Sequence, residues 1–352
     1  MISPARDLAF RVLKKVHNGG YASDLLRHES VALSTRDAGL AEAIVMGVLR
    51  YQGQLNFLIG HFAGRAQPKL DLEVRIALQM GIYQLRYLDR IPPHAAVMES
   101  VELAKNAKPS AAGFANAVLR KVHRNPVKWP DRATELSLPP WMLARWDKQF
   151  GAEAAEKIAR AALAEPEACI NPETGRQQDP GAQTIVPLLE IEPGMTFLDL
   201  CAAPGNKTAQ AIAAGARVVA CDRYLNRLED VPDAARRVVL DATKPLPFSK
   251  KFDRILIDAP CSGTGTLGRN PEIKWRLKPG DANIFAARQR EILDQARRLM
   301  KPGGRMVYAT CSLENEENQN VVQALRLRAE THLRLPGRDP GDGFFAAVIT
   351  LV

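Results

Sequence analysis

The stretch that most constrains this chain is residues 196–207, Thr-Phe-Leu-Asp-Leu-Cys-Ala-Ala-Pro-Gly-Asn-Lys. Its apolar start, Thr196 to Leu200, predicts a buried strand. The small residues from Cys201 to Asn206 predict a tight turn, and the Ala-rich run from Thr208 to Ala214 predicts a helix. A strand, a small-residue turn and a helix begin a nucleotide-binding βαβ unit, in which free N–H groups point at the ligand. The stretch alone leaves two interpretations open, a site for a nucleoside-like cofactor and a purely structural corner.

After residue 196, short apolar runs alternate with helical segments. We expect strands at 217–221, 237–240, 254–257 and 306–310, and helices at 281–300 and 314–328. Alternating strands and helices predict a mostly parallel sheet with helices on both faces, an α/β, Rossmann-like fold.

Four acids stand at or just past the ends of predicted strands: Asp199, Asp222, Asp241 and Asp258. Ligands of open α/β sheets bind outside the carboxyl ends of the strands, so these acids should face one site. Asp222 suits a pair of ribose hydroxyls, and Asp241 would reach an adenine edge. Asp258 would meet the charged end of a cofactor or the substrate base. A single acid more often caps a helix or pairs with an arginine, but four at successive strand ends favour a cofactor site.

The first third of the chain shows only helical periodicity. Ser3-Pro4 predicts a helix start, and Ser34 or Thr35 and then Asp71 predict two more. Without any strand-like alternation before residue 130, we expect an all-α bundle.

The middle of the chain predicts a linker at 126–142, helices at 141–150 and 152–164, and a loop at 165–183. The expected domains are a helical domain at 1–128, a linker with a shortened helical subdomain at 129–183, and an α/β domain at 184–352.

The net charge of +9 is concentrated near the N-terminus. Residues 1–130 hold 18 Lys and Arg against 10 Asp and Glu, whereas residues 131–352 hold 30 against 29. A basic module favours a polyanionic partner, RNA or DNA first, although charge spread over solvated helix surfaces would give the same total. The candidates for phosphate contacts are Arg50, Arg120, Lys121 and Arg124.

The five cysteines are Cys169, Cys201, Cys221, Cys261 and Cys311, with no C-x-x-C pair. This spacing argues against a disulfide framework and a zinc site, so we expect no metal and a reducing cytoplasm. No signal peptide and no apolar run long enough for a membrane span is predicted. Cys261 and Cys311 each follow a predicted strand and enter a turn on the ligand side, which sets them apart from the other three.

Four motifs together resemble the S-adenosylmethionine-dependent RNA cytosine-C5 methyltransferases: Leu-Asp-Leu-Cys-Ala-Ala-Pro-Gly-Asn-Lys-Thr, Asp-Ala-Pro-Cys-Ser-Gly-Thr-Gly, Arg-Asn-Pro-Glu-Ile-Lys-Trp-Arg and Ala-Thr-Cys-Ser-Leu. Residues 5–10, 47–50, 81–85 and 114–120 resemble the NusB-type RNA-binding bundle. The two modules in one chain are similar to the RsmB (Fmu/Sun) family of 16S rRNA methyltransferases, over residues 5–125 and 180–350.

The resemblance implies an enzyme that transfers the methyl group of S-adenosylmethionine to C5 of a cytosine in small-subunit (16S) rRNA. It implies Cys311 as the nucleophile that adds to C6, and Cys261 as the residue that aids release. It also implies that Asp258 bonds the base near N3 and N4, and that Lys207 favours the thiolate. The implied cofactor-binding residues are Cys201, Ala202, Ala203, Pro204, Gly205, Asn206, Lys207, Asp222, Asp241 and Asp258.

Some features depart from the family pattern. Asn206 replaces the second Gly of Ala-Pro-Gly-Gly-Lys, and we expect it to take the positive φ of that turn. Asp222 and Asp241 lie so close in sequence that the helix between them must be short. The motif Cys169-Ile-Asn-Pro lacks the family's Arg, and residues 165–183 cannot hold an RNA-contacting subdomain of the usual size.

Two alternatives stay open: an RNA-binding ribosome-assembly factor with weak or lost catalysis, and a cytosine-C5 methyltransferase of another RNA such as tRNA. A DNA cytosine methyltransferase is less favoured, because those enzymes use the Pro-Cys residue as nucleophile and lack the Thr-Cys motif. The expected partner is 16S rRNA, free or in a partly assembled small subunit. We expect a cytoplasmic monomer that does not associate with membranes.

Overall fold

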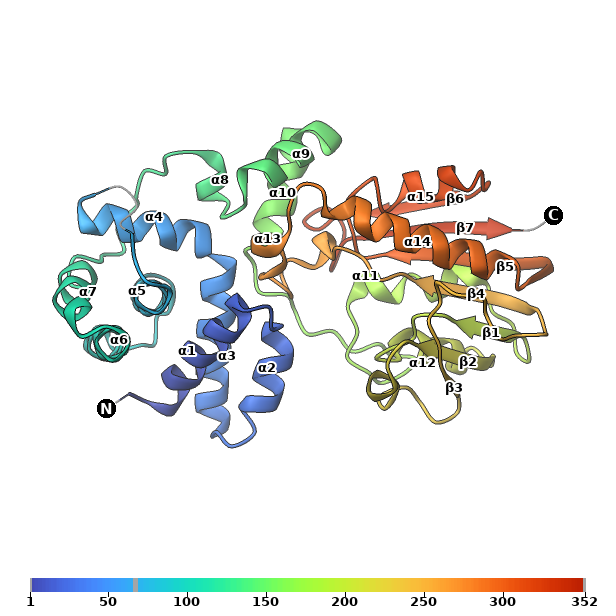
Figure 1. Cartoon of the computed structure of the whole chain (residues 1–352), viewed down its shortest axis with the longest axis horizontal. Coiled ribbons are helices and arrows are strands. Elements are labelled where there is room, and N and C mark those ends of the chain that lie inside the picture. Colours follow the sequence, from blue (N-terminus) through green and yellow to red (C-terminus); the bar gives the residue numbers. More distant parts are fainter. Residues whose placement is uncertain (1, 66–68, 351–352) are drawn as a thin grey trace. The chain divides into compact units, whose positions relative to one another are not determined.

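The structure is a computed structural model that describes residues 2–65 and 69–350 (Figure 1). The chain divides into two compact units. Unit 1 comprises Met1–Leu163 and Leu267–Arg276, and unit 2 comprises Ala164–Thr266 and Leu277–Val352.

Unit 1 contains helices and no strand among its described residues. The starts predicted for three of its helices are confirmed. Pro4 opens the first helix after Ser3, the Ser34 side chain accepts a hydrogen bond from the Asp37 N–H, and another helix begins one residue after Asp71. The helices are α1 (Pro4–His17), α2 (Ala22–Glu29), α3 (Thr35–Arg50), α4 (Gln52–Ala63), α5 (Leu72–Tyr87), α6 (Pro93–Ala107), η1 (Pro109–Ala111), α7 (Ala112–Leu119), α8 (Arg132–Glu135), α9 (Pro140–Phe150), α10 (Ala152–Ala161) and α13 (Ile273–Arg276).

The core of unit 1 is largely apolar and contains a buried ion pair. Arg6 of α1 donates to Glu99 of α6 at 2.8 Å and to the Gln84 side chain of α5 at 2.7 Å. Ser3 donates to Glu99 through both its N–H and its hydroxyl. Each buried charge therefore has several partners, which offsets the cost of removing it from water.

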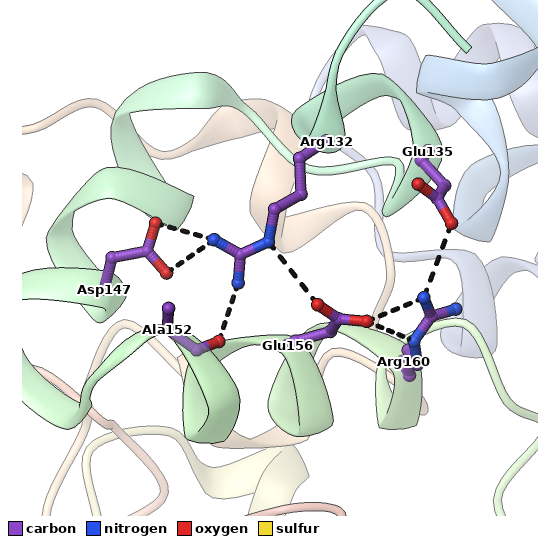
Figure 2. Close-up of polar contacts among 6 residues, drawn as sticks. All are labelled: Arg132, Glu135, Asp147, Ala152, Glu156 and Arg160. Carbon is purple, nitrogen blue, oxygen red and sulfur yellow. Dashed lines mark hydrogen bonds and ion pairs between the residues drawn. The ribbon is translucent and has the colours of Figure 1, made fainter. Parts of the chain in front are cut away.

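Residues 126–142 were expected to be a linker, and the structure shows this to be wrong. They include α8 and the first residues of α9, because polar side chains tie α8, α9 and α10 together. Arg132 donates to Asp147 at 2.9 Å and to the Ala152 carbonyl at 2.7 Å, and lies 3.6 Å from Glu156. Figure 2 shows this network, which comprises Arg132, Glu135, Asp147, Ala152, Glu156 and Arg160.

The segment 267–276 belongs to unit 1 although it is distant from α1 and α3 in sequence. Lys274 Nζ donates to the Arg50 carbonyl at 2.8 Å, and Trp275 Nε1 donates to the Leu49 carbonyl at 2.7 Å. These carbonyls end α3, where no intrahelical N–H remains to bond them. The segment thus caps a helix of the N-terminal bundle.

Two of the four residues predicted to contact phosphate, Arg50 and Arg124, make hydrogen bonds to groups of unit 1. Arg50 is 7% exposed, and its Nε donates to the Gly268 carbonyl at 3.0 Å. Arg124 donates to carbonyls at the end of α5 and pairs with Asp89. Arg50 is therefore not accessible to phosphate in this structure, whereas Arg120, Lys121 and Arg124 are exposed.

Unit 2 is built on a seven-stranded sheet in the order β3-β2-β1-β4-β5-β7-β6. Neighbours from β3 to β5 are parallel, and β7 is antiparallel to both β5 and β6. The prediction of a mostly parallel, Rossmann-like sheet is confirmed. The strand order reverses between β1 and β4, which is where ligands of such sheets bind. The strands are β1 (Thr196–Asp199), β2 (Arg217–Asp222), β3 (Arg236–Val239), β4 (Phe252–Asp258), β5 (Met300–Thr310), β6 (Glu330–Arg334) and β7 (Phe344–Thr350).

Helices cover both faces of this sheet (Figure 1). One core packs strand residues such as Phe197 against α12 and η2, and the other packs Leu198 and its neighbours against α14 and α15. Successive strand residues point to opposite faces, so both faces are apolar. The helical elements are α11 (Pro180–Gln183), η2 (Val186–Leu189), α12 (Asn206–Ala213), η3 (Leu225–Leu228), η4 (Thr264–Thr266), α14 (Asp281–Arg297) and α15 (Gln319–Ala324). No helix in the described residues is long and apolar enough to span a membrane.

Two segments of unit 2 differ from the sequence expectation. The helix predicted at 314–328 is reduced to α15. Residues 314–318 form a turn instead, in which Glu317 and Asn318 make hydrogen bonds to Ser312. Strands β6 and β7 were not predicted. The short helix expected between Asp222 and Asp241 is confirmed as η3.

Candidate active site

The loop from β1 to α12 turns on one glycine. Gly205 has φ +99°, and a Cβ there would lie 2.8 Å from the Val231 Cα. Only glycine fits that position without strain. Asn206 is the first residue of α12 and has no positive φ. The expectation that Asn206 takes the positive φ is therefore wrong, and asparagine causes no backbone strain there.

The side chain of Asn206 ties this loop to the segment before the sheet. Its Oδ1 accepts from Arg176 Nε at 2.9 Å, and its Nδ2 donates to the Gln177 carbonyl at 3.0 Å. Arg176 also donates to the Pro204 and Asp230 carbonyls, at 3.2 and 3.0 Å. Arg176 was not identified from the sequence, since nothing local connects it with residue 206.

Residues 201–204 complete the loop next to β2. Ala202 N–H donates to the Cys221 carbonyl at 2.8 Å, and Gly205 N–H donates to the Ala202 carbonyl at 2.7 Å. Burial and the nearby carboxylates raise the pKa of the Cys201 thiol, so it stays protonated. The Cys201 and Ala202 side chains pack against the two apolar cores of unit 2.

Asp222 and Asp241 lie at the ends of the neighbouring strands β2 and β3. Asp222 is 5% exposed, accepts from the Tyr224 N–H at 3.1 Å and lies 3.6 Å from Arg227. Asp241 accepts from the N–H and hydroxyl of Thr243, and these bonds lower its pKa. Both acids are held in place by the protein.

Asp199 at the end of β1 is the most deeply buried of the four acids. Burial raises its pKa to about 7, against the lowering effect of the Thr208 hydroxyl that donates to it at 2.8 Å. Thr208 belongs to α12, so Asp199 fixes the first turn of that helix against β1.

Lys207 and Asp258 form an ion pair of 2.6 Å at the end of β4. Burial works against a charge on Lys207, but the Asp258 carboxylate outweighs it, so the pKa of the ammonium is raised. The Cys311 sulfur adds to this effect. The Lys207 ammonium also lies 5.3 Å from the centre of the Phe344 ring. The site therefore holds a fixed cation next to Cys311.

Cys261 and Cys311 face each other with their sulfurs 3.2 Å apart. They follow β4 and β5, which pair with Asp258 opposite Ala309. The Cys311 sulfur and burial raise the pKa of the Cys261 thiol well above its usual value. Cys261 thus keeps its proton.

Gly265 lets the two cysteine loops approach closely. Its N–H donates to the Cys311 carbonyl at 2.8 Å. A Cβ at this position would lie 2.4 Å from the Gly343 carbonyl oxygen and 2.8 Å from that of Cys311. Any side chain at 265 would push the loops apart.

A buried carboxylate that the sequence did not reveal joins both loops. Glu317 accepts from the hydroxyls of Ser262 and Ser312, and from the Ser262 N–H at 2.9 Å. Burial raises its pKa, against the lowering effect of these donors. The available signal was the pair of acids at 314 and 317 directly after the Thr-Cys motif.

The residues at the strand ends fit a nucleoside-type ligand. The nearly buried carboxylate of Asp222 suits hydroxyl donors, and the glycine turn opens into the N-terminus of α12. The described residues contain no group of three or more His, Cys, Asp or Glu side chains arranged to hold a metal ion. Lys207 and Asp258 lie at the end of β4, and the two cysteines follow β4 and β5.

Fold and site together define a class: a Rossmann-like methyltransferase unit in a chain with a NusB-type helical unit. A family model for the NusB family matches residues 3–124, and one for 16S rRNA methyltransferase RsmB/F matches residues 186–342. The solved structure of PH0851 covers 99% of both chains with a TM-score of 0.78 at 20% identity, which supports the fold.

Comparison with curated proteins then gives the family. Ribosomal RNA small subunit methyltransferase B of Klebsiella pneumoniae (strain 342) is 32% identical, over 97% of this chain and 97% of its own length. The protein called probable ribosomal RNA small subunit methyltransferase B in Bacillus subtilis (strain 168) is 30% identical over 91% of this chain and 87% of its own. This chain belongs to the ribosomal RNA small subunit methyltransferase B family.

Proposed function

We propose that this chain transfers a methyl group from S-adenosylmethionine to C5 of a cytosine in small-subunit (16S) rRNA, through a covalent bond between Cys311 and C6. The observation that carries the proposal is the contact of the two cysteine sulfurs, 3.2 Å apart, beside the ion pair of Lys207 and Asp258. A nucleophile, a second thiol and a charged pair that can bind a base then meet at one sheet edge.

The residues proposed to hold the cofactor lie in the loop 201–206 and at the neighbouring strand ends. Asp222 would accept the ribose hydroxyls, and Asp241 would lie along the adenine edge. When bound, S-adenosylmethionine supplies an electrophilic methyl group on its sulfonium. The chain's own contribution is to bind and orient it with a preformed turn, held by Gly205 and Asn206.

Cys311 is proposed to react as the thiolate, because only the thiolate is a strong nucleophile. The Lys207 ammonium stabilises that charge. The sulfur bonds to C6 of the cytosine, and the electrons of the 5,6 double bond move to C5. C5 then becomes nucleophilic enough to accept the methyl group.

Lys207 and Asp258 are proposed to hold the base. The carboxylate oxygens of Asp258, which lies 2.6 Å from the Lys207 ammonium, accept hydrogen bonds, so Asp258 suits the N4 amino group. Lys207 is donor-only and suits N3. The base must leave any helical stack to reach this pair.

Cys261 is proposed to release the product. After the C5 proton is lost to a base in the solvent, the C5–H electrons re-form the double bond and expel the Cys311 sulfur. The Cys261 thiol lies 3.2 Å from that sulfur and keeps its proton, so its S–H can donate a hydrogen bond to the leaving thiolate and stabilise it.

The helical unit is proposed to bind the rRNA, free or within a partly assembled subunit, with the chain acting as a cytoplasmic monomer. The basic balance of residues 1–130 supports this. The names of the curated relatives, which are bacterial proteins, give ribosomal RNA as their substrate.

The test is methyl transfer from labelled S-adenosylmethionine to unmodified 16S rRNA, followed by nucleoside analysis. The full chain should yield 5-methylcytidine at one position. Cys311→Ala should yield none, and Cys169→Ala, which changes a cysteine outside the pair, should behave as the unaltered chain.

Other outcomes separate the alternatives. Methylation of tRNA in preference to rRNA would show that the substrate is tRNA and not 16S rRNA. Salt-dependent rRNA binding with no methyl transfer to any RNA would favour an assembly factor. Full activity of Cys311→Ala would overturn the covalent mechanism.

A further inference from the structure

The turn between β5 and α15 wraps the loop that carries Cys311. Asn318 accepts from the Thr310 hydroxyl at 2.6 Å and donates to the Ser312 carbonyl at 2.9 Å. The Glu317 carbonyl accepts from the Tyr308 hydroxyl at 2.5 Å. The backbone of Glu317 is therefore fixed to β5, and its carboxylate points into the interior, where its exposure is 0%.

The two oxygens of this carboxylate serve both cysteine loops. Oε1 accepts from the hydroxyls of Ser262 and Ser312, and Oε2 accepts from the Ser262 N–H. Ser262 directly follows Cys261, and Ser312 directly follows Cys311. One side chain thus bonds the neighbour of each cysteine.

A third connection comes from α14. Gln289 Nε2 donates to Glu317 Oε2 at 3.0 Å and to the Pro260 carbonyl at 2.9 Å. Pro260 directly precedes Cys261. The carboxylate therefore fixes Cys261 from both sides along the chain, through Ser262 and through Gln289.

We propose that Glu317 is a positioning residue that sets the spacing of Cys261 and Cys311 by accepting hydrogen bonds from the serine after each. A purely packing role does not need a carboxylate with four donors aimed at it, because a buried apolar residue would fill the space without the desolvation cost. This inference rests on the proposed function of the two cysteines, but the spacing itself can be measured without turnover.

The charge of Glu317 has a second consequence. It contributes, after the Cys311 sulfur and burial, to keeping the Cys261 pKa high. The residue that fixes the geometry therefore also adds to the main effects of the Cys311 sulfur and of burial.

The first measurement is the rate at which diamide oxidises the pair to a Cys261–Cys311 disulfide in the full chain, read by peptide mass spectrometry. Diamide takes up the two protons and two electrons of the thiols. Glu317→Ala should cross-link at least about tenfold more slowly, because the loops lose their common anchor. Glu317→Gln should stay within about threefold, because the serine hydroxyls can turn to accept from its amide.

The second measurement is methyl-transfer kinetics. Glu317→Ala should lower kcat by about 100-fold while KM for RNA and for S-adenosylmethionine change little, as expected for misplaced reacting groups. Glu317→Gln should restore most of kcat. Glu316→Ala is the matched control, since none of these hydrogen bonds involves it, and it should match the unaltered chain in both measurements.

Wild-type rates of cross-linking in Glu317→Ala would overturn the positioning role, as would an unchanged kcat. Should that variant fail to fold, Ser262→Ala and Ser312→Ala each remove the hydroxyl bond of that serine to Glu317. Slower cross-linking in both supports the proposal, and unchanged rates in both overturn it. A chain that cross-links as expected but never methylates RNA would refute the proposed function alone.

Discussion

Asn206 closes the loop between β1 and α12 through its side chain. Its two hydrogen bonds, to Arg176 and to the Gln177 carbonyl, join the loop to residues that precede Asn206 by 30 and 29 positions in the sequence. The backbone at 206 is helical, so a glycine there would gain nothing.

Asn206→Gly and Asn206→Ala should therefore weaken cofactor binding alike. Each removes two hydrogen bonds, worth about 1 kcal/mol in total where they are partly exposed, which corresponds to a loss of about five- to tenfold in affinity. Calorimetry with S-adenosylmethionine checks this. Tighter binding by the glycine variant than by the alanine variant would instead indicate a backbone requirement.

Lys274 is a fully buried lysine whose only described hydrogen bond is to the Arg50 carbonyl. Burial, with the Arg50 guanidinium adding to it, lowers its pKa to about 7. In the unfolded chain the lysine has a pKa of about 10.4, so between that pH and pH 7 only the unfolded state gains the proton. The free energy of unfolding is therefore highest above about pH 10.4 and falls as the pH decreases toward 7.

Lys274→Met removes this titration. Between about pH 10 and pH 7 the unaltered chain should lose up to about 4 kcal/mol of unfolding free energy more than the variant does. Urea unfolding at both pH values, followed by circular dichroism, measures the difference. Equal losses in the two proteins would show that Lys274 titrates normally.

At the scale of elements, segment 267–276 joins the bundle that the first third of the chain forms. Arg276 donates to the carbonyls of Val16, at 2.7 Å, and of Gly20. Ala22 N–H, at the start of α2, donates to Glu272 at 3.0 Å. Unit 1 is therefore complete only with this segment.

Arg276→Ala should lower the free energy of unfolding by about 2 kcal/mol, because it removes charged hydrogen bonds to backbone groups. Lys278→Ala, an exposed lysine two residues on, is the control and should change little. Thermal unfolding of the two variants makes the comparison, and equal melting temperatures would count against the capping role.

The parallel strands and most helices could be predicted, because their apolar spacing and caps are local signals. The polar edge strand β6 carries no apolar pattern to detect. The helix at 314–328 was overpredicted, because the buried Glu317 and Asn318 serve the cysteine loops instead of a helix surface. The site's acids and cysteines follow from sequence motifs, whereas Arg176 and Glu317 act through tertiary contacts that no local pattern encodes.

For the whole molecule, the uneven charge predicts how RNA binding responds to salt. If the excess in residues 1–130 binds phosphates, the affinity of the full chain for rRNA should fall linearly with salt on logarithmic axes. Arg120, Lys121 and Arg124 are exposed and remain the candidates.

The double variant Arg120→Ala, Lys121→Ala should make the slope of log affinity against log salt concentration shallower by about 1 to 2. Each lost phosphate contact releases about one counterion fewer. Lys250→Ala with Lys251→Ala, two exposed lysines of unit 2, is the matched control and should leave the slope unchanged. Filter binding over a salt series gives both slopes. A larger effect in the control pair would place the RNA contacts elsewhere.

The most direct test of the account is the covalent bond itself. Cys261→Ala, mixed with S-adenosylmethionine and unmodified 16S rRNA, should stop after methyl transfer and give a protein–RNA band on a denaturing gel. Digestion and mass spectrometry should place the link on Cys311 and on a methylated cytosine. A link to any other residue, or no link while the unaltered chain methylates the same RNA, would contradict the assigned roles of the two cysteines.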